Sequence, residues 1–191
     1  MPEPTAAPPG ADSARAALGL CHRCIGGMLD RLDALVVEIA ATATGTPEAA
    51  LADRARTLVA ELDEAMAVHI ADEEADVFPA LLAACDSPAR RAQAFELVSS
   101  LLVEHREMAE HWHALRIALL AIGSGVAVSF PGGTAASYLT LARAHVAREE
   151  LELADLMRVI DAPRTQRIAV AIAHRHEEAC TRVRNCPLDK P

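Results

Sequence analysis

Two copies of the pattern His-x-x-x-Glu stand in the sequence, one at His69 and Glu73 and the other at His145 and Glu149. Residues four positions apart in an α-helix lie one turn apart on the same face. Each copy therefore brings an imidazole and a carboxylate to one place. Imidazole nitrogens and carboxylate oxygens are common ligands of divalent metal ions, so the repeated pattern indicates a metal site.

Two further histidines, His22 and His105, lie in two other long segments with helical periodicity. Counting residues from the turns, with a rise of about 1.5 Å per residue, puts the four histidines and two glutamates at similar heights along adjacent antiparallel helices. All six fall on apolar seams, where an unpaired ionisable group is costly to bury. A single buried histidine is more often a hydrogen-bonded structural residue, but four beside two carboxylates favour a shared metal centre.

The ligand types narrow the choice of metal. A set of four nitrogens and two carboxylates suits iron or manganese, and zinc is compatible with it. Carboxylates can bridge two ions. Six protein ligands over two ions also leave coordination positions open, which chemistry with oxygen or peroxide requires.

Four long segments position these residues. Their apolar side chains recur at alternating steps of three and four, as in amphipathic helices. The segments span about residues 12–41, 47–85, 88–122 and 134–160. Thr46 and Thr134 are the expected N-caps of the second and fourth helices, and Asp86-Ser87-Pro88 has the order of a cap followed by a proline.

Long helices joined by short loops are typical of a four-helix bundle. We therefore predict an all-α fold, an up-down-up-down antiparallel four-helix bundle over residues 12–160 with an additional C-terminal helix over 161–185. Residues 1–11 are expected to be a disordered tail, and 186–191 a second tail. The additional helix is rich in arginine in an otherwise acidic chain. We expect it to pack on the outside of the bundle or to mediate self-association.

Composition excludes several classes of function. Hydrophobic residues make up 52% of the chain and aromatic residues only 3%, which favours helices over sheets. The net charge of −9 argues against a nucleic-acid partner. No apolar run approaches the roughly 20 residues of a membrane span, and the first residues do not have the pattern of a secretory signal. Five cysteines, an odd number, suggest free thiols in a reducing cytosol, so we expect a cytoplasmic protein.

Other polar residues near these patterns have simpler interpretations. Exposed positions are expected for three acidic residues and four histidines: Asp72, Glu74, Glu150, His111, His113, His174 and His176. Cys21 and Cys24 stand one turn apart and could form a redox pair or bind metal, but inert thiols are the favoured interpretation. Gly26, one turn after His22, either permits close helix packing or leaves room for a small ligand at an open metal position.

Four stretches of the chain carry a family resemblance: CHRC at residues 21–24, HIADEEADVFPAL at 69–81, EHRE at 104–107 and HVAREE at 145–150. Together they resemble the hemerythrin-like HHE cation-binding domain family, over about residues 15–160. The resemblance implies a bundle around a non-haem di-iron centre with carboxylate bridges and an oxo or hydroxo bridge. Carried over by position, it implies that Glu73 and Glu149 bridge the two ions. The implied ligand set is His22, His69, Glu73, His105, His145 and Glu149.

Two positions depart from the oxygen-carrying hemerythrins. Those proteins have a second histidine four residues after the third-helix ligand, where this chain has Ala109. They also have an aspartate five residues after the last-helix histidine, where this chain has Glu149 at four. The pattern is more similar to the branch associated with sensing of iron, oxygen or nitric oxide, or with peroxide handling.

We therefore expect a di-iron protein that senses or responds to oxygen, nitric oxide, peroxide or iron and does not transport oxygen. The alternative is a di-iron enzyme that decomposes peroxide or reduces nitric oxide, and a weaker third hypothesis is a metal-free helical scaffold. The expected partners are a small diatomic ligand or peroxide. A homodimer is possible, and neither nucleic acid nor a membrane is expected.

Overall fold

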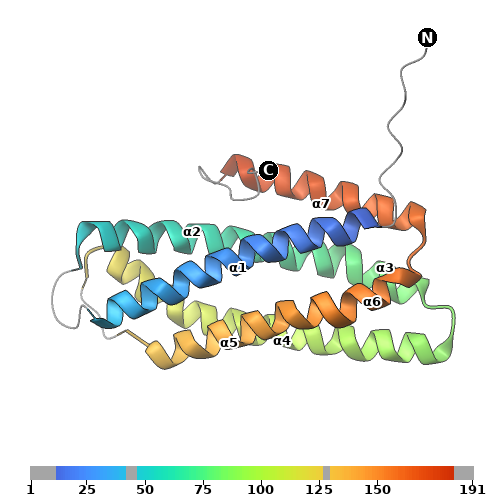
Figure 1. Cartoon of the computed structure of the whole chain (residues 1–191), viewed down its shortest axis with the longest axis horizontal. Helices are drawn as coiled ribbons and strands as arrows, with labels where there is room; N and C mark the ends of the chain where they lie inside the picture. The colour runs from blue at the N-terminus through green and yellow to red at the C-terminus, as the bar shows by residue number, and fades with distance from the viewer. Residues whose placement is uncertain (1–11, 42–46, 127–129, 183–191) are drawn as a thin grey trace, which may run out of the picture.

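The computed structural model describes residues 12–41, 47–126 and 130–182, and within these ranges all regular structure is helical (Figure 1). Seven α-helical stretches are joined in two places by π-helical segments and in one by a short 3-10 turn. In chain order they are α1 (Asp12–Ala41), α2 (Ala49–Ala71), η1 (Asp72–Val77), α3 (Phe78–Ala84), α4 (Pro88–Gly123), α5 (Gly132–Arg148), η2 (Glu149–Leu153), α6 (Ala154–Leu156), η3 (Met157–Val159) and α7 (Ala162–Arg182).

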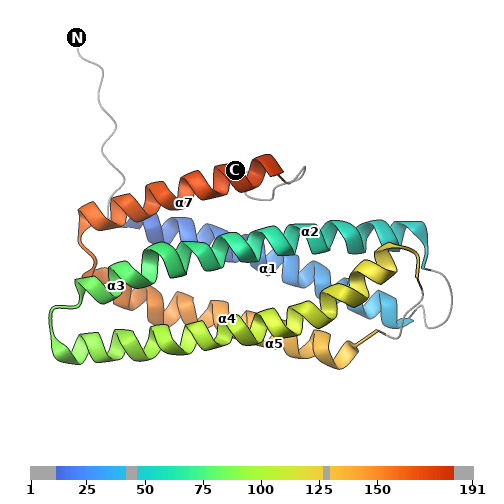
Figure 2. The same ribbon diagram turned by 180° about the vertical axis from the view of Figure 1, so that it is seen from behind.

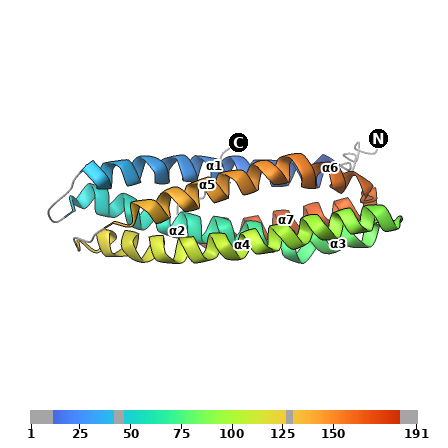
Figure 3. The ribbon, with the colours of Figure 1, turned by 90° about the horizontal axis from the view of Figure 1, so that it is seen from below.

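The long helices form the predicted up-down-up-down bundle. Helix α2 continues through η1 into α3, and α5 continues through η2 into α6, so each pair makes one long rod (Figure 2). Seen from below, α1 and the rod of α5 and α6 form one layer, and α2 and α4 form the other (Figure 3). Consecutive rods run in opposite directions. The predicted fold class is confirmed, including the additional C-terminal helix.

The helix starts agree in part with the expected caps. The Ser87 side chain accepts a hydrogen bond from the Arg90 backbone N–H at 3.3 Å, and Pro88 begins α4. The prediction of Thr134 as a cap is wrong: α5 begins at Gly132, because the carbonyl of Pro131 already accepts from the N–H of Ala135. The other expected cap, Thr46, lies outside the described residues.

The two π-helical segments coincide with the repeated sequence pattern and were not predicted. In each, a glutamate carbonyl accepts from the N–H five residues later: Glu73 from Phe78, and Glu149 from Ala154. A step of four residues overshoots one α-helical turn by about 40°. If apolar residues follow one another at successive steps of four, the apolar face rotates away from the core. A turn with more residues removes this rotation. The π-helical turn does this, and such turns are frequent at functional sites.

The apolar core consists of two clusters separated by a polar layer. One cluster fills the bundle between α1, α2, α4 and α5, and the other fills the end where α3, α6 and α7 meet. On three rods the change of cluster takes place across the predicted ligands: Met66 to Val77, Leu101 to Met108 and Ala142 to Leu153. On α1 it takes place just before His22, between Leu18 and Cys21. The candidate site is thus a polar slab with apolar packing on both sides.

Helix α7 packs on the outside of the bundle, along α1 and α2 (Figures 1 and 2). Ile168 and Ile172 on α7 belong to the second apolar cluster. Among the described residues, no helix is both long and apolar enough to cross a membrane.

A buried ion pair also holds α7, and it corrects two expectations. Asp72, expected on a solvated face, is fully buried in η1. Its carboxylate accepts from Arg175 and lies 2.7 Å from Nε2 of His176, while Arg175 also donates to Asp76 at 2.6 Å. His176 is therefore mostly covered, whereas His174 is exposed as predicted.

We expect Arg175→Met to destabilise the fold, because it leaves the Asp72 carboxylate buried with only His176 as a partner. Removing one partner of a buried ion pair typically costs about 3–5 kcal/mol. Since the Arg175 side chain is 24% exposed and His176 remains, we expect a loss of about 2 kcal/mol in the free energy of unfolding, measured by urea denaturation. Arg167→Met, an exposed position on the same helix, is the control. Equal midpoints for both variants would contradict the anchoring role.

Candidate metal centre

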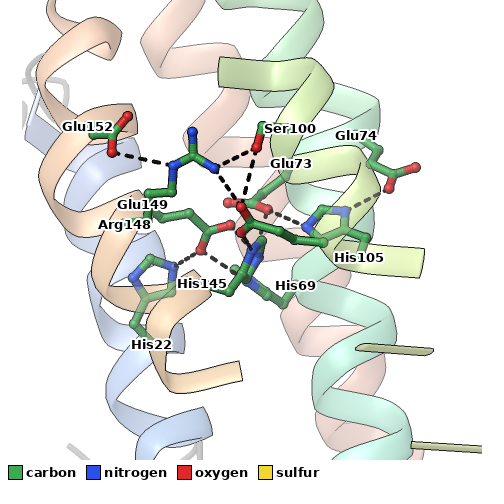
Figure 4. A network of polar contacts seen from close by, with 11 residues as sticks. His22, His69, Glu73, Glu74, Ser100, His105, His145, Arg148, Glu149 and Glu152 are labelled. Atoms are coloured by element: carbon green, nitrogen blue, oxygen red, sulfur yellow. Dashed lines mark hydrogen bonds and ion pairs between the residues drawn. The ribbon is translucent and has the colours of Figure 1, made fainter. Parts of the chain in front are cut away.

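The structure brings the six candidate ligands together in the middle of the bundle (Figure 4). Each has a relative exposure of 5% or less. The imidazole rings are close neighbours: the centroids of His22 and His69 are 5.1 Å apart, and those of His105 and His145 are 4.8 Å apart. The single layer expected from residue counts is therefore present.

The six residues form two groups that share both carboxylates. One group contains His22 and His69, the other contains His105 and His145, and Glu73 and Glu149 belong to both. Within each group, one potential ligand atom from every residue lies within 4.8 Å of all the others. The chain thus contains two adjacent buried His₂Glu₂ groups, the arrangement of a binuclear cation site.

Most of the atoms that could bind metal have no hydrogen-bond partner. This holds for the Nε2 atom of all four histidines and for both carboxylate oxygens of Glu73 and Glu149. Buried polar atoms are rarely left unsatisfied, because each costs roughly 1–3 kcal/mol. Because such atoms from each group lie within 4.8 Å of one another, a cation between them can satisfy them.

The spacing of these atoms also suits coordination. Bonds from a metal ion to nitrogen or oxygen, about 2.0–2.2 Å long, place neighbouring ligand atoms about 3 to 3.5 Å apart. Glu149 Oε2 lies 3.2 Å from His22 Nε2 and 3.4 Å from His69 Nε2. His105 Nε2 lies 3.2 Å from Glu73 Oε2, and His145 Nε2 is closer to Glu149 Oε1, at 2.6 Å. The residues present therefore fit a pair of cations.

Two acidic residues orient histidines from outside the groups, and a third lies near a ring. The Nδ1 atoms of His105 and His145 lie 2.8 Å from Glu74 and Glu104 and form hydrogen bonds with them. Such hydrogen bonds fix ring orientation and raise the basicity of a ligating histidine. Glu150 lies 3.5 Å from His22 Nδ1, without a hydrogen bond. Glu74 and Glu150 were expected only on solvated faces and are 42% and 56% exposed, yet the carboxylate of Glu74 holds a ring.

The side chains beside the histidine rings are arranged in the same way on every rod. Each belongs to the residue next to a candidate ligand on one rod, and it lies beside the candidate histidine of the next rod. Glu74, beside Glu73, reaches His105 on α4, and Glu104, beside His105, reaches His145 on α5. Glu150, beside Glu149, lies near His22, and the thiol of Cys21, beside His22, contributes to the raised pKa of His69. Neither forms a hydrogen bond with the Nδ1 atom of its histidine.

Glu104 is itself held in place by a cation. Arg148 donates hydrogen bonds to Glu104 and, at 2.6 Å, to the hydroxyl of Ser100, and its Nε lies 3.3 Å from Glu152 (Figure 4). The carboxylate that orients His145 is therefore fixed by a guanidinium from the same helix as His145. Sequence reasoning missed both residues, although Glu104 stands directly before a predicted ligand.

Burial and mutual contact shift the ionisation of the group. Burial disfavours a charged His69, but the carboxylate of Glu73, the thiol of Cys21 and the carboxylate of Glu149 outweigh it and raise the pKa of His69 well above its ordinary value. Burial also disfavours a charged His145, but contacts with Glu149 and Glu104 outweigh burial and raise the pKa of His145. Burial raises the pKa of Glu73, whereas imidazole contacts outweigh burial and hold the pKa of Glu149 well below its usual range. Without metal, protons on His69 and His145 therefore offset part of the carboxylate charge.

The cysteines contribute free thiols in the described part of the chain. Cys21 and Cys85 are buried, Cys24 is half-buried, and none of the three is in a disulfide. Burial, followed by the influence of Cys21, raises the pKa of the Cys24 thiol, which makes it a weaker nucleophile at neutral pH. This agrees with the interpretation as inert thiols, except that Cys21 contacts a candidate ligand.

Comparison with known proteins gives one family match. The model of the Hemerythrin HHE cation binding domain matches residues 14–157, which is more than half of the chain. No curated protein and no solved structure matches the chain significantly. The matched range contains all six candidate ligands and the three acidic residues beside their rings.

We expect metal binding to release protons. Imidazoles must be neutral to bind a metal ion, and His69 and His145 have raised pKa values. Affinity should therefore rise as the pH rises through these pKa values. Titration calorimetry in buffers of different ionisation enthalpy should show release of at least about one proton per chain at neutral pH. A binding heat independent of the buffer contradicts this.

The same ionisation has the opposite effect on the protein without metal. A raised pKa in the folded state stabilises the fold below the ordinary pKa of histidine, and this contribution is lost as the pH rises through the raised value. Thermal unfolding of the metal-depleted protein should therefore show a melting temperature that falls with pH over that interval.

We expect Glu104→Gln to weaken metal binding without unfolding the protein. An amide orients His145 less well than a carboxylate and leaves Arg148 with a neutral partner. Loss of such an orienting group typically lowers metal affinity about 10- to 100-fold, which competition with a chromophoric chelator can measure. Glu107→Gln, on the exposed face of the same helix, is the control and should leave affinity unchanged.

Proposed function

The chain belongs to the hemerythrin HHE cation-binding family, and we propose that it is a non-haem di-iron protein that senses or responds to oxygen, nitric oxide, peroxide or iron. The observation that carries the proposal is the pair of buried His₂Glu₂ groups with two shared carboxylates. Two groups with common carboxylates suit two ions held close together, with Glu73 and Glu149 as bridges.

The donor types support iron as the metal. Each group offers two imidazole nitrogens and carboxylate oxygens, a mixed set that suits iron and manganese, while zinc also binds such ligands. The unpartnered Nε2 and carboxylate atoms support the six residues as those that would hold the ions. Bound there, iron would supply redox chemistry and open positions for small ligands, while Glu74 and Glu104 fix two of the rings.

The equal number of histidines in the two groups supports a function other than oxygen transport. Both groups have two histidines each, so the second group lacks the additional histidine that the resemblance assigns to oxygen carriers. Ala109, which stands at that position, is an exposed residue of α4 without a side-chain donor. The two groups are consequently alike in ligand type. Open positions at such a centre also suit the alternative, an enzyme that decomposes peroxide or reduces nitric oxide.

Metal analysis tests the di-iron proposal. Protein loaded with ferrous iron and desalted should retain about two iron ions per chain, as expected from two ligand groups. A variant with His69→Ala should lose most of this iron, whereas His174→Ala, at an exposed histidine of α7, should not. Retention below about half an iron per chain in the wild type contradicts the proposal and favours the scaffold hypothesis.

Two measurements, of oxygen evolution and of visible absorption, distinguish the functions. A sensor should evolve oxygen gas from hydrogen peroxide no faster than the His69→Ala variant, and sustained turnover above that control supports the enzyme instead. The reduced, iron-loaded protein should be oxidised by oxygen without forming a stable oxygenated absorption band. A stable band that disappears under vacuum would show that the protein carries oxygen after all.

A further inference from the structure

A cavity of about 180 Å³ reaches the candidate centre from the side of the bundle, between α1 and the rod that contains η2 and α6. His22 and Glu149 lie at its inner end, and both are candidate ligands of the same group. Apolar side chains, among them Leu18, Leu153 and Met157, line the rest. The cavity therefore leads from the surface toward one of the two groups.

A small residue keeps this cavity open. Gly19 lies one helical turn before His22 and lines the cavity. A Cβ atom added at Gly19 meets only the end of the Arg23 side chain, at 3.7 Å, so packing of backbone against backbone does not require glycine there. Gly26, for which the sequence suggested room for a ligand, is not among the lining residues. The open side of the centre is thus at Gly19, on the other side of His22.

A cation stands at the outer end of the cavity. Arg15 and Glu150 line both this cavity and a larger surface hollow of about 700 Å³ next to it, whose wall carries charges of both signs. The carboxylate of Glu150 is directed to His22 Nδ1. The Nε–H group of Arg15 is buried and has no hydrogen-bond partner. A buried donor without a partner is costly, and a small anion passing or resting beside it would satisfy it.

The size and lining limit what can occupy the cavity. A water molecule occupies about 30 Å³ of liquid volume, so the cavity holds molecules of a few heavy atoms, whereas pockets for metabolites are typically about 300–1,000 Å³. Azide binds the ferric protein, in which two ions carry six positive charges against five carboxylates: Glu73 and Glu149 in the groups, and Glu74, Glu104 and Glu150 beside the rings. The inner end then attracts anions, as Arg15 does at the outer end.

We propose that this cavity is the passage by which small ligands reach the centre, and that Arg15 makes the passage selective for inorganic anions of two or three heavy atoms, such as azide, nitrite or hydroperoxide. The inference rests on the proposed di-iron centre. It assigns a role to two residues, Gly19 and Arg15, that belong to neither His₂Glu₂ group.

The test measures ligand association by stopped-flow absorbance, with azide as the anionic probe of the ferric protein and nitric oxide as the neutral probe of the ferrous protein. Gly19→Leu and Ala154→Leu fill the cavity from opposite walls. Each should slow both probes at least about tenfold, because binding then needs a rearrangement of the walls. Gly26→Leu, at a position where an added Cβ meets nothing within 4 Å, is the matched control and should leave both rates unchanged.

Selectivity for anions is tested at Arg15. Arg15→Met should slow azide about tenfold, as loss of electrostatic guidance predicts, and leave nitric oxide unchanged. Added salt should slow azide binding to the wild type much more than to this variant. Arg167→Met, which removes an exposed charge on α7, is the control. Equal slowing of azide and nitric oxide by Arg15→Met contradicts a role of its charge.

Iron content separates this inference from the proposed function. All variants are analysed for iron before the kinetics, and two occluding variants are used so that one remains informative if the other loses metal. A wild type that retains no iron contradicts the di-iron proposal and the passage with it. A wild type with two irons, and unchanged azide and nitric oxide rates in the iron-loaded occluded variants, contradicts the passage alone.

Discussion

The burial of four imidazoles and two carboxylates between two apolar clusters is the constraint on which the rest of this structure depends. Neither end of the core can be packed without enclosing these groups, and their Nε2 and carboxylate atoms lack hydrogen-bond partners. Isolated ionised groups in an apolar interior are very unfavourable. Protons on His69 and His145 offset part of the carboxylate charge, and cations can offset all of it. The fold and the centre are therefore stabilised together.

The contacts around the centre couple its geometry to the packing of the bundle. Glu74, Glu104, Glu150 and Cys21 each stand beside a candidate ligand and contact the histidine of the next rod. A shift of one rod therefore moves its own ligand and also the side chain that lies beside its neighbour's ligand. Helix α7 adds to this order, because Arg175 and His176 hold Asp72, the residue before Glu73. Positioning of the two shared carboxylates is thus distributed over the four rods of the bundle and α7.

Periodicity was sufficient to predict the bundle and the residues that meet at its centre, because both follow from which face each helix buries. It was not sufficient for the π-helical segments, although the steps from His69 to Glu73, Val77 and Leu81 are all four residues long, a spacing that an α-helix cannot keep on one face. Nor could it place Asp72, whose burial depends on α7. The exposed faces assigned to Glu74 and Glu150 follow from helix geometry, but their contacts depend on the neighbouring rod.

The two copies of the sequence pattern nevertheless build unequal surroundings. The Nδ1 atoms of His105 and His145 each have a carboxylate at 2.8 Å, whereas the Nδ1 atoms of His22 and His69 have no hydrogen-bond partner. The rings of the two groups are therefore held unequally although their ligand types are the same. The cavity also reaches His22 and neither His105 nor His145. Two features with different origins, the missing Nδ1 hydrogen bonds and the open wall, thus distinguish the same group, and through the proposed passage a small ligand reaches this group first.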